Sequence, residues 1–202
     1  SWLHQGQICM SAGRHLVHET VAGEYARRMA EKAKALPVGD PHRQQVALGP
    51  IITPQQVQRV DRIVKESVAM GARLLAGGTC EGQFYAATVL ADVTPQMPVF
   101  REEIFGPVVA ITSFATDAEA IALANDSEYG LSAGVHTRDI GRGMAMADQL
   151  NVGLVHVNDQ TVNDDGTMPM GGRGASGNGS RHGGPANWDE FTQWQWLTVR
   201  NT

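Results

Sequence analysis

Cys9 is the residue whose type and setting most directly suggest chemistry. It lies in the stretch HQGQICMSAGR, residues 4–14, which also holds the small residues Ser11, Ala12 and Gly13. Taken alone, a cysteine is more often a small buried hydrophobic residue than a nucleophile. Here a preceding glycine lets the backbone turn closely, and the small neighbours leave room for a thiol to face a narrow cavity. Both interpretations, an inert thiol and a nucleophile, follow from these residues.

Two other patterns could do chemistry and are less persuasive. Residues 172–177 spell GxGxxG, but no strand leads directly into these glycines and more glycine follows. A tight loop is therefore favoured over a phosphate cradle. The histidines lack a paired spacing such as HExxH, which argues against a metal site. The four considered lie in apolar runs, at His15, His18, His136 and His156.

These residues must be positioned by alternating helices and strands. Helical spacing of apolar residues, with Pro and Gly at the ends, predicts four helices, over residues 21–35, 54–70, 117–125 and 140–150. Short apolar runs predict five strands, over residues 15–19, 73–78, 108–114, 132–137 and 153–158. This alternation is typical of an α/β fold with a mainly parallel sheet. We expect Arg14 to pair with an acid that fixes the Cys9 loop.

The C-terminal stretch TQWQWLTVR, residues 192–200, alternates polar and large apolar residues like a strand. A lone strand with two tryptophans would expose apolar surface, so we expect it to seek a partner edge. The predicted organisation is a domain over residues 1–184 and an extension over residues 185–202 that carries this strand.

Composition excludes several classes of partner. The 202 residues carry a net charge of −5 without a Lys/Arg run, which disfavours nucleic acid. No apolar run is long enough for a membrane span, and two distant cysteines suit a reducing cytoplasm. The first residues resemble no targeting signal and lack an initiator Met, so we expect the chain to start inside a larger polypeptide.

Three ordered motifs resemble the aldehyde dehydrogenase superfamily. They are GQICMSAGR, EEIFGPV at residues 102–108, and PxGGxxxSGxG from Pro169 to Gly179. LGPIIT and the terminal aromatic stretch extend the similarity over essentially the whole chain. The sequence of the C-terminal part of the chain is most similar to the benzaldehyde and vanillin dehydrogenase branch. The resemblance implies a three-layer α/β sandwich with a mainly parallel sheet and a C-terminal oligomerisation strand, in a homodimer or homotetramer.

The resemblance also implies roles for individual residues. Cys9 is the expected catalytic nucleophile, and the cofactor is NAD or NADP. Glu103 would accept hydrogen bonds from the nicotinamide ribose, because a carboxylate suits a vicinal diol. The ring of Phe105 would pack against the nicotinamide end, and Gln56 would make another ribose contact. Without the resemblance, the acids of EEIFGP would be a solvated pair before a Gly-Pro turn.

The substrate implied is a small aldehyde, with an aromatic one favoured by the branch. The residues expected to contact it flank the thiol or line the aldehyde tunnel, and they are Ile8, Met10, Val162, Asn163 and Met170. Met170 stands where the motif commonly has Phe, which weakens the fit to a flat aromatic substrate.

The reaction expected of the parent protein is oxidation of the aldehyde to a carboxylic acid through a thiohemiacetal and a thioester on Cys9. The family supplies the general base, the oxyanion asparagine and the glycine-rich cofactor domain from sequence upstream of the motif, so we expect this chain alone to be inactive. Two alternatives stay open. The thioester could be intercepted by coenzyme A, or the chain could be a non-enzymatic interaction module in which Cys9 reacts slowly.

Overall fold

A four-stranded sheet forms the centre of the fold. The computed structural model describes residues 1–201. The sheet order is β1-β6-β5-β2, with β1 and β5 parallel to the central β6 and β2 antiparallel to β5. The strands are β1 (Arg14–His18), β2 (Arg73–Ala76), β5 (Thr88–Ala91) and β6 (Val108–Phe114). The mainly parallel arrangement confirms the predicted fold class.

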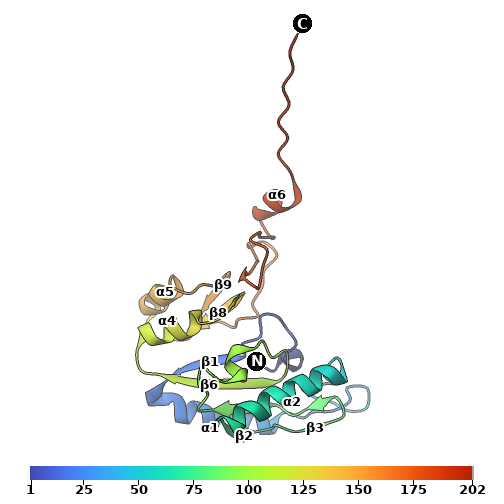
Figure 1. The fold of residues 1–202 in the computed structure, drawn as a ribbon, viewed down its shortest axis with the longest axis vertical. Helices are drawn as coiled ribbons and strands as arrows, with labels where there is room; N and C mark the ends of the chain where they lie inside the picture. Colours follow the sequence, from blue (N-terminus) through green and yellow to red (C-terminus); the bar gives the residue numbers. More distant parts are fainter. Residues whose placement is uncertain (202) are drawn as a thin grey trace.

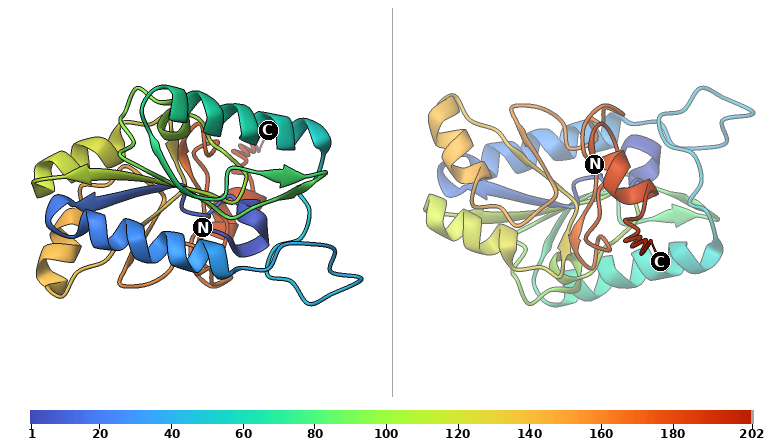
Figure 2. Two further views of the ribbon diagram at one scale, coloured as in Figure 1. Left: turned by 90° about the horizontal axis from the view of Figure 1, so that it is seen from below. Right: turned by 90° about the horizontal axis from the view of Figure 1, so that it is seen from above.

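Two long helices cover opposite faces of this sheet, α1 (Glu19–Ala35) and α2 (Pro54–Ala69) (Figures 1 and 2). The buried side chains of β6 alternate between the two faces. Val108 and Ala110 belong to the core under α2, whereas Val109 and Ile111 belong to the core under α1. Burial on both faces explains the uninterrupted apolar run of this strand. The result is three layers, helix on sheet on helix.

The helix ends follow the local sequence signals. Thr53 caps α2 by accepting a hydrogen bond from the Gln56 amide at 3.2 Å, and Pro54 occupies the first helical position. The predicted helix over 54–70 is therefore confirmed almost to the residue. The predicted helix over 117–125 is α4 (Asp117–Asn125), which is capped by Thr116.

A second unit lies beside the central sheet. In it β8 (Ser132–Val135) pairs in parallel with β9 (Leu154–Val157), and α5 (Ile140–Ala147) connects them. Among the described residues β8 forms no ladder with β1, so β8 and β9 form a sheet apart from the central one, where a single sheet was expected. Residues of β1 and of β8 line the cavity that lies between these two strands. The two units are drawn one above the other in Figure 1.

Short elements complete the chain and were not predicted, because elements of two to six residues leave little periodicity. They are η1 (Leu3–Gly6), the β3 (Cys80–Glu81) and β4 (Phe84–Tyr85) hairpin, α3 (Pro98–Arg101), the β7 (Tyr129–Gly130) and β10 (Arg173–Gly174) pair, and α6 (Ala186–Phe191). The buried strand β5 was also missed.

Arg14 differs from expectation, because its partners are backbone carbonyls and not an acid. Its guanidinium donates to the carbonyl oxygens of Leu123 at 3.1 Å and Ala124 at 2.9 Å, and it lies over the ring of Phe100. These carbonyls end α4, where unpaired oxygens carry partial negative charge. Arg14 therefore joins the start of β1 to the end of α4.

The segment 192–201 has no regular secondary structure in this chain and projects from the folded part (Figure 1). Trp194 and Trp196 are exposed. The expected strand thus finds no partner among residues 1–201, and its pairing with a second copy stays a prediction. No helix of the described residues is long and apolar enough to cross a membrane.

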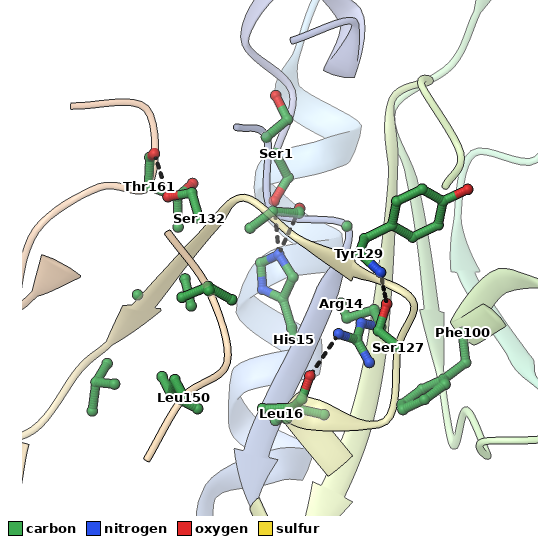
Figure 3. A pocket seen from close by; sticks show the side chains of 18 of the residues that line it. Ser1, Arg14, His15, Leu16, Phe100, Ser127, Tyr129, Ser132, Leu150 and Thr161 are labelled. Atoms are coloured by element: carbon green, nitrogen blue, oxygen red, sulfur yellow. Dashed lines mark hydrogen bonds between the residues drawn. The ribbon is translucent and has the colours of Figure 1, made fainter. Parts of the chain in front are cut away.

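We expect a half-buried histidine to make the fold sensitive to acid. His15 on β1 has Nδ1 at 2.6 Å from the Tyr25 hydroxyl. Its Nε2 lies 2.7 Å from Ser1 Oγ (Figure 3). Burial lowers the pKa of His15 from 6.5 to about 4. An unfolded chain takes up this proton near pH 6.5, whereas the folded chain resists it until about pH 4.

We therefore expect His15 to make the free energy of unfolding fall by about 3 kcal/mol as the pH drops through this window. Urea unfolding of the chain and of His15→Leu, at intervals from pH 7 to pH 4, measures the effect. The variant is expected to be less stable at pH 7 but to lose less stability on acidification. Parallel pH profiles for the two proteins would contradict the assignment.

Candidate active site

Cys9 stands at the tip of a tight turn that we call the nucleophile turn, residues 8–11. The Ser11 amide donates to the Ile8 carbonyl at 2.9 Å, which closes the turn. Cys9 is exposed and lines a cavity of about 650 Å³. Its own amide N–H makes no hydrogen bond within residues 1–201. Cys9 therefore combines an exposed thiol with a backbone N–H that has no hydrogen-bond partner among the described residues.

The nucleophile turn is held close to a second loop, residues 102–107, by contact between two glycines. Gly6 has φ of +69°, and a Cβ built on it would lie 2.1 Å from the Gly106 carbonyl oxygen. A Cβ on Gly106 would lie 2.6 Å from Cγ2 of Val60 on α2. Neither position has room for a side chain, so the two backbones and the helix are in direct contact.

Gln7 forms hydrogen bonds that connect the same region to the segment just before α2. Its Oε1 accepts a hydrogen bond from the Ile52 amide at 2.9 Å, and its Nε2 donates to the Pro50 carbonyl at 3.5 Å. One side chain thus satisfies a donor and an acceptor of the LGPIIT stretch. The glutamine of the motif serves to place the turn.

The 102–107 loop is held by the polar side of α2. Gln56 donates through Nε2 to the carbonyl oxygens of Ile104 at 2.8 Å and Phe105 at 3.0 Å. Arg59 donates to the Ile104 carbonyl at 3.0 Å and to that of Glu103. Phe105 has φ of +50°, a left-handed conformation that costs free energy and that these bonds maintain.

The two acids of this loop have different partners. Glu102 receives two hydrogen bonds from Arg62, at 3.0 and 2.9 Å, and also faces Arg59 at 3.4 Å. The Glu103 carboxylate makes no hydrogen bond or ion pair within residues 1–201, and Glu103 lines the cavity. Glu102 therefore has a structural ion pair, while Glu103 can accept donors from a ligand.

The structure brings together four of the predicted site residues. Ile8, Cys9, Glu103 and Phe105 all line the large cavity. Gln56 does not line it, and its amide nitrogen donates to the carbonyls of the 102–107 loop. The ribose contact of Gln56 stays a prediction.

The other predicted substrate residues lie away from this cavity's lining. Val162 and Asn163 belong to the loop that follows β9, which we call the 158–163 loop, and Asn163 donates to Asp159. Met170 exchanges backbone hydrogen bonds with His182 and lines a separate cavity of about 170 Å³. Met10 is half-buried beside Cys9.

Sequence reasoning missed other residues of the large cavity, among them Ser132, Tyr129 and Thr161. These types are common on any surface, so no signal in the sequence singles them out. Within residues 1–201 no cluster of three or more His, Cys, Asp or Glu could hold a metal ion. Cys80 is exposed on β3.

A family model described as "Aldehyde dehydrogenase family" matches residues 1–197. The chain belongs to the aldehyde dehydrogenase family. This membership confirms the resemblance drawn from the three motifs, and it identifies the chain as part of an oxidoreductase family that acts on aldehydes. The membership also agrees with the structure, in which residues of the nucleophile turn and of the 102–107 loop line the same cavity.

Aromatic aldehyde dehydrogenases are among the relatives of this family member. Benzaldehyde dehydrogenase [NAD(+)] of Pseudomonas putida is 54% identical over 199 residues, which are 98% of this chain and 41% of that protein. Vanillin dehydrogenase of an Amycolatopsis species is 51% identical over 99% of this chain and 41% of the relative. The chain thus spans about two fifths of the length of the curated relatives it matches.

Solved structures of the family show the same fold. A salicylaldehyde dehydrogenase from Pseudomonas putida G7, complexed with salicylaldehyde, superimposes with a TM-score of 0.94 at 40% identity, over 100% of this chain and 42% of that one. A Mycobacterium tuberculosis aldehyde dehydrogenase complexed with NAD+ gives a TM-score of 0.89 at 36% identity, over 95% and 40% of the two chains.

The Gly6 contact yields a stability prediction for this family member. Gly6→Ala would place a methyl group against the Gly106 carbonyl and strain a left-handed backbone, so we expect a loss of more than about 2 kcal/mol of unfolding free energy. Gly23→Ala is the matched control. Gly23 lies within α1 with nothing near its Cβ position, and we expect a gain of roughly 0.5–1 kcal/mol. Urea unfolding of the chain measures both, and equal stabilities would contradict the contact.

Proposed function

We propose that this chain is the catalytic segment of an NAD(P)-dependent dehydrogenase that oxidises a small aromatic aldehyde to its carboxylic acid. The observation that carries the proposal is the single cavity shared by Cys9, Glu103 and Phe105. The identity of 54% to a benzaldehyde dehydrogenase supports the aromatic substrate. The salicylaldehyde bound to a structural neighbour supports it further.

Cys9 acts as the nucleophile. Its thiolate attacks the aldehyde carbon, a C–S bond forms, and the carbonyl oxygen becomes an oxyanion. The unpaired amide N–H of Cys9 is available to donate to that oxyanion, and the turn closed by Ser11 and Ile8 fixes its direction. A donor placed where charge develops stabilises the transition state more than the ground state.

The 102–107 loop fits the nicotinamide end of the cofactor. The Glu103 carboxylate has no partner within residues 1–201 and can accept two hydroxyl donors of a ribose. The Phe105 ring offers a flat apolar surface in the cavity that Cys9 also lines, and Gln56 and Arg59 hold the backbone of Phe105 and Ile104. A bound nicotinamide supplies the acceptor for the hydride that leaves the aldehyde carbon.

The thioester that remains on Cys9 is hydrolysed by water, which releases the carboxylic acid and regenerates the thiolate. We expect the general base and the oxyanion asparagine from the portion of the relatives that this chain does not span. We also expect a cytoplasmic homodimer or homotetramer in which residues 192–200 pair with another subunit. The exposed Trp194 and Trp196 support such pairing.

The first test of the proposal is Cys9→Ser in an active context. The context is a chimera in which this chain replaces the matching segment of the Pseudomonas putida benzaldehyde dehydrogenase, a replacement at 54% identity. We expect Cys9→Ser to lower production of the reduced cofactor by more than a thousandfold, because an alkoxide is far less accessible than a thiolate. Cys80→Ser, at the other exposed cysteine, should change the rate less than twofold.

Circular dichroism and gel filtration establish that each chimera is folded before rates are compared. Activity of folded Cys9→Ser within tenfold of the unchanged chimera would contradict the nucleophile assignment. Iodoacetamide labelling of the 202-residue chain gives a check that needs no chimera, since a nucleophilic Cys9 should react faster than Cys80.

The second test concerns substrate preference. We expect kcat/KM of the chimera for benzaldehyde to exceed that for acetaldehyde by at least tenfold, because a ring buries more apolar surface than a methyl group. The host enzyme run in parallel shows how much of the ratio comes from its own segment. A preference for acetaldehyde in the chimera alone would contradict the aromatic substrate and leave the aldehyde reaction standing.

A further inference from the structure

A single side chain joins the nucleophile turn to the 158–163 loop. Oγ1 of Thr161 donates a hydrogen bond to the carbonyl oxygen of Met10 at 2.6 Å, across 151 positions of sequence. Met10 directly follows Cys9, and both Thr161 and Met10 are half-buried. Within residues 1–201 no other side chain forms a hydrogen bond with residues 8–11. Gln7 and His15 bond to the backbone at or beyond the two ends of the turn, whereas Thr161 bonds to the turn itself among the described residues.

Thr161 is itself held from β8. Its carbonyl oxygen accepts a hydrogen bond from Ser132 Oγ at 2.8 Å, and Figure 3 shows this pair at the side of the cavity facing Ser1 and His15. A chain of two hydrogen bonds thus runs from β8 through the 158–163 loop to the nucleophile turn. Both donors are hydroxyls that line the cavity.

Hydrogen bonds therefore hold the turn on both sides of the thiol, and each side is bonded to a different unit of the fold. On the N-terminal side Gln7 binds the backbone of Pro50 and Ile52, next to α2. On the C-terminal side Thr161 binds Met10 from the β8–β9 unit. Since β1 and β8 share no ladder within residues 1–201, this bond fixes the thiol relative to the loop that follows β9.

We propose that Thr161 is a positioning residue that sets the placement of Cys9 relative to the 158–163 loop, with Ser132 supporting it. The functional consequence rests on the proposed function and on the prediction from the family resemblance that Val162 and Asn163 of this loop contact the aldehyde. A nucleophile displaced by a fraction of an ångström from the bound carbonyl reacts more slowly even when binding is intact. The bond therefore affects the chemical step more than the affinity.

The structural part is tested on the 202-residue chain without any substrate. Thr161→Val keeps the side-chain shape and removes the donor, and Thr161→Ser keeps the donor. We expect amide exchange of Ser11, measured by NMR, to rise about fivefold to tenfold in Thr161→Val and to stay within twofold in Thr161→Ser. Ser132→Ala should give a smaller rise. Unchanged exchange in a Thr161→Val chain of unchanged melting temperature would overturn the proposal.

The kinetic part uses the same variants in the chimera. We expect Thr161→Val to lower kcat about tenfold with KM for benzaldehyde within threefold, and Thr161→Ser to restore kcat to within threefold. A raised KM with unchanged kcat would overturn positioning in favour of a direct substrate contact. If the chimera without substitutions does not oxidise aldehydes, the proposed function is contradicted. The amide-exchange measurement would still decide the role of Thr161.

Discussion

The close approach of two backbones, at Gly6 and Gly106, is the constraint on which the site depends. It brings the segment that ends in Cys9 against the segment that carries Glu103 and Phe105, although about a hundred positions separate them in sequence. Neither glycine can gain a side chain without overlap with backbone or with Val60. The nucleophile and the carboxylate therefore meet in one cavity because two positions carry no side chain.

Helix α2 turns this contact into a defined geometry. Its apolar face enters the core, with Val60 packed on Gly106, while its polar face presents Gln56 and Arg59 to the carbonyls of the 102–107 loop. The same helix thus supplies packing energy and directional hydrogen bonds to one short loop. Those bonds keep Phe105 in a left-handed conformation that an isolated loop would leave.

The elements that depend on periodicity and local chemistry could be predicted from the sequence. Thr53 and Pro54 marked the start of α2, and the apolar run 108–114 marked the central strand, because capping and burial act over a few residues. The motif around Cys9 and the acids at 102–103 could be found because their sequences, order and approximate spacing resemble those of a known family. The family match agrees with the identification those motifs gave.

The rest depended on contacts that no local pattern encodes. Arg14 was expected to pair with an acid, yet it binds carbonyls of α4 that lie more than a hundred positions away. The ribose contact of Gln56 stays a prediction, and the structure adds that its amide nitrogen donates to two carbonyls of the 102–107 loop. In both cases the sequence identified a polar side chain with a function, but its backbone partners could not be predicted, because backbone carbonyls look alike in every sequence.

The division of the fold into two units gives these backbone contacts their functional meaning. The central sheet fixes Cys9 through β1 and the carboxylate through β6, while the β8–β9 unit carries the 158–163 loop. Between them lies the cavity, so the groups for chemistry and the loop proposed for substrate selection are built on separate supports. Such an arrangement lets the loop vary in sequence without disturbing the nucleophile, provided that the link between the units is kept. A hydroxyl bonded to a backbone carbonyl suits that purpose, because the carbonyl of Met10 is present whatever side chain follows the cysteine.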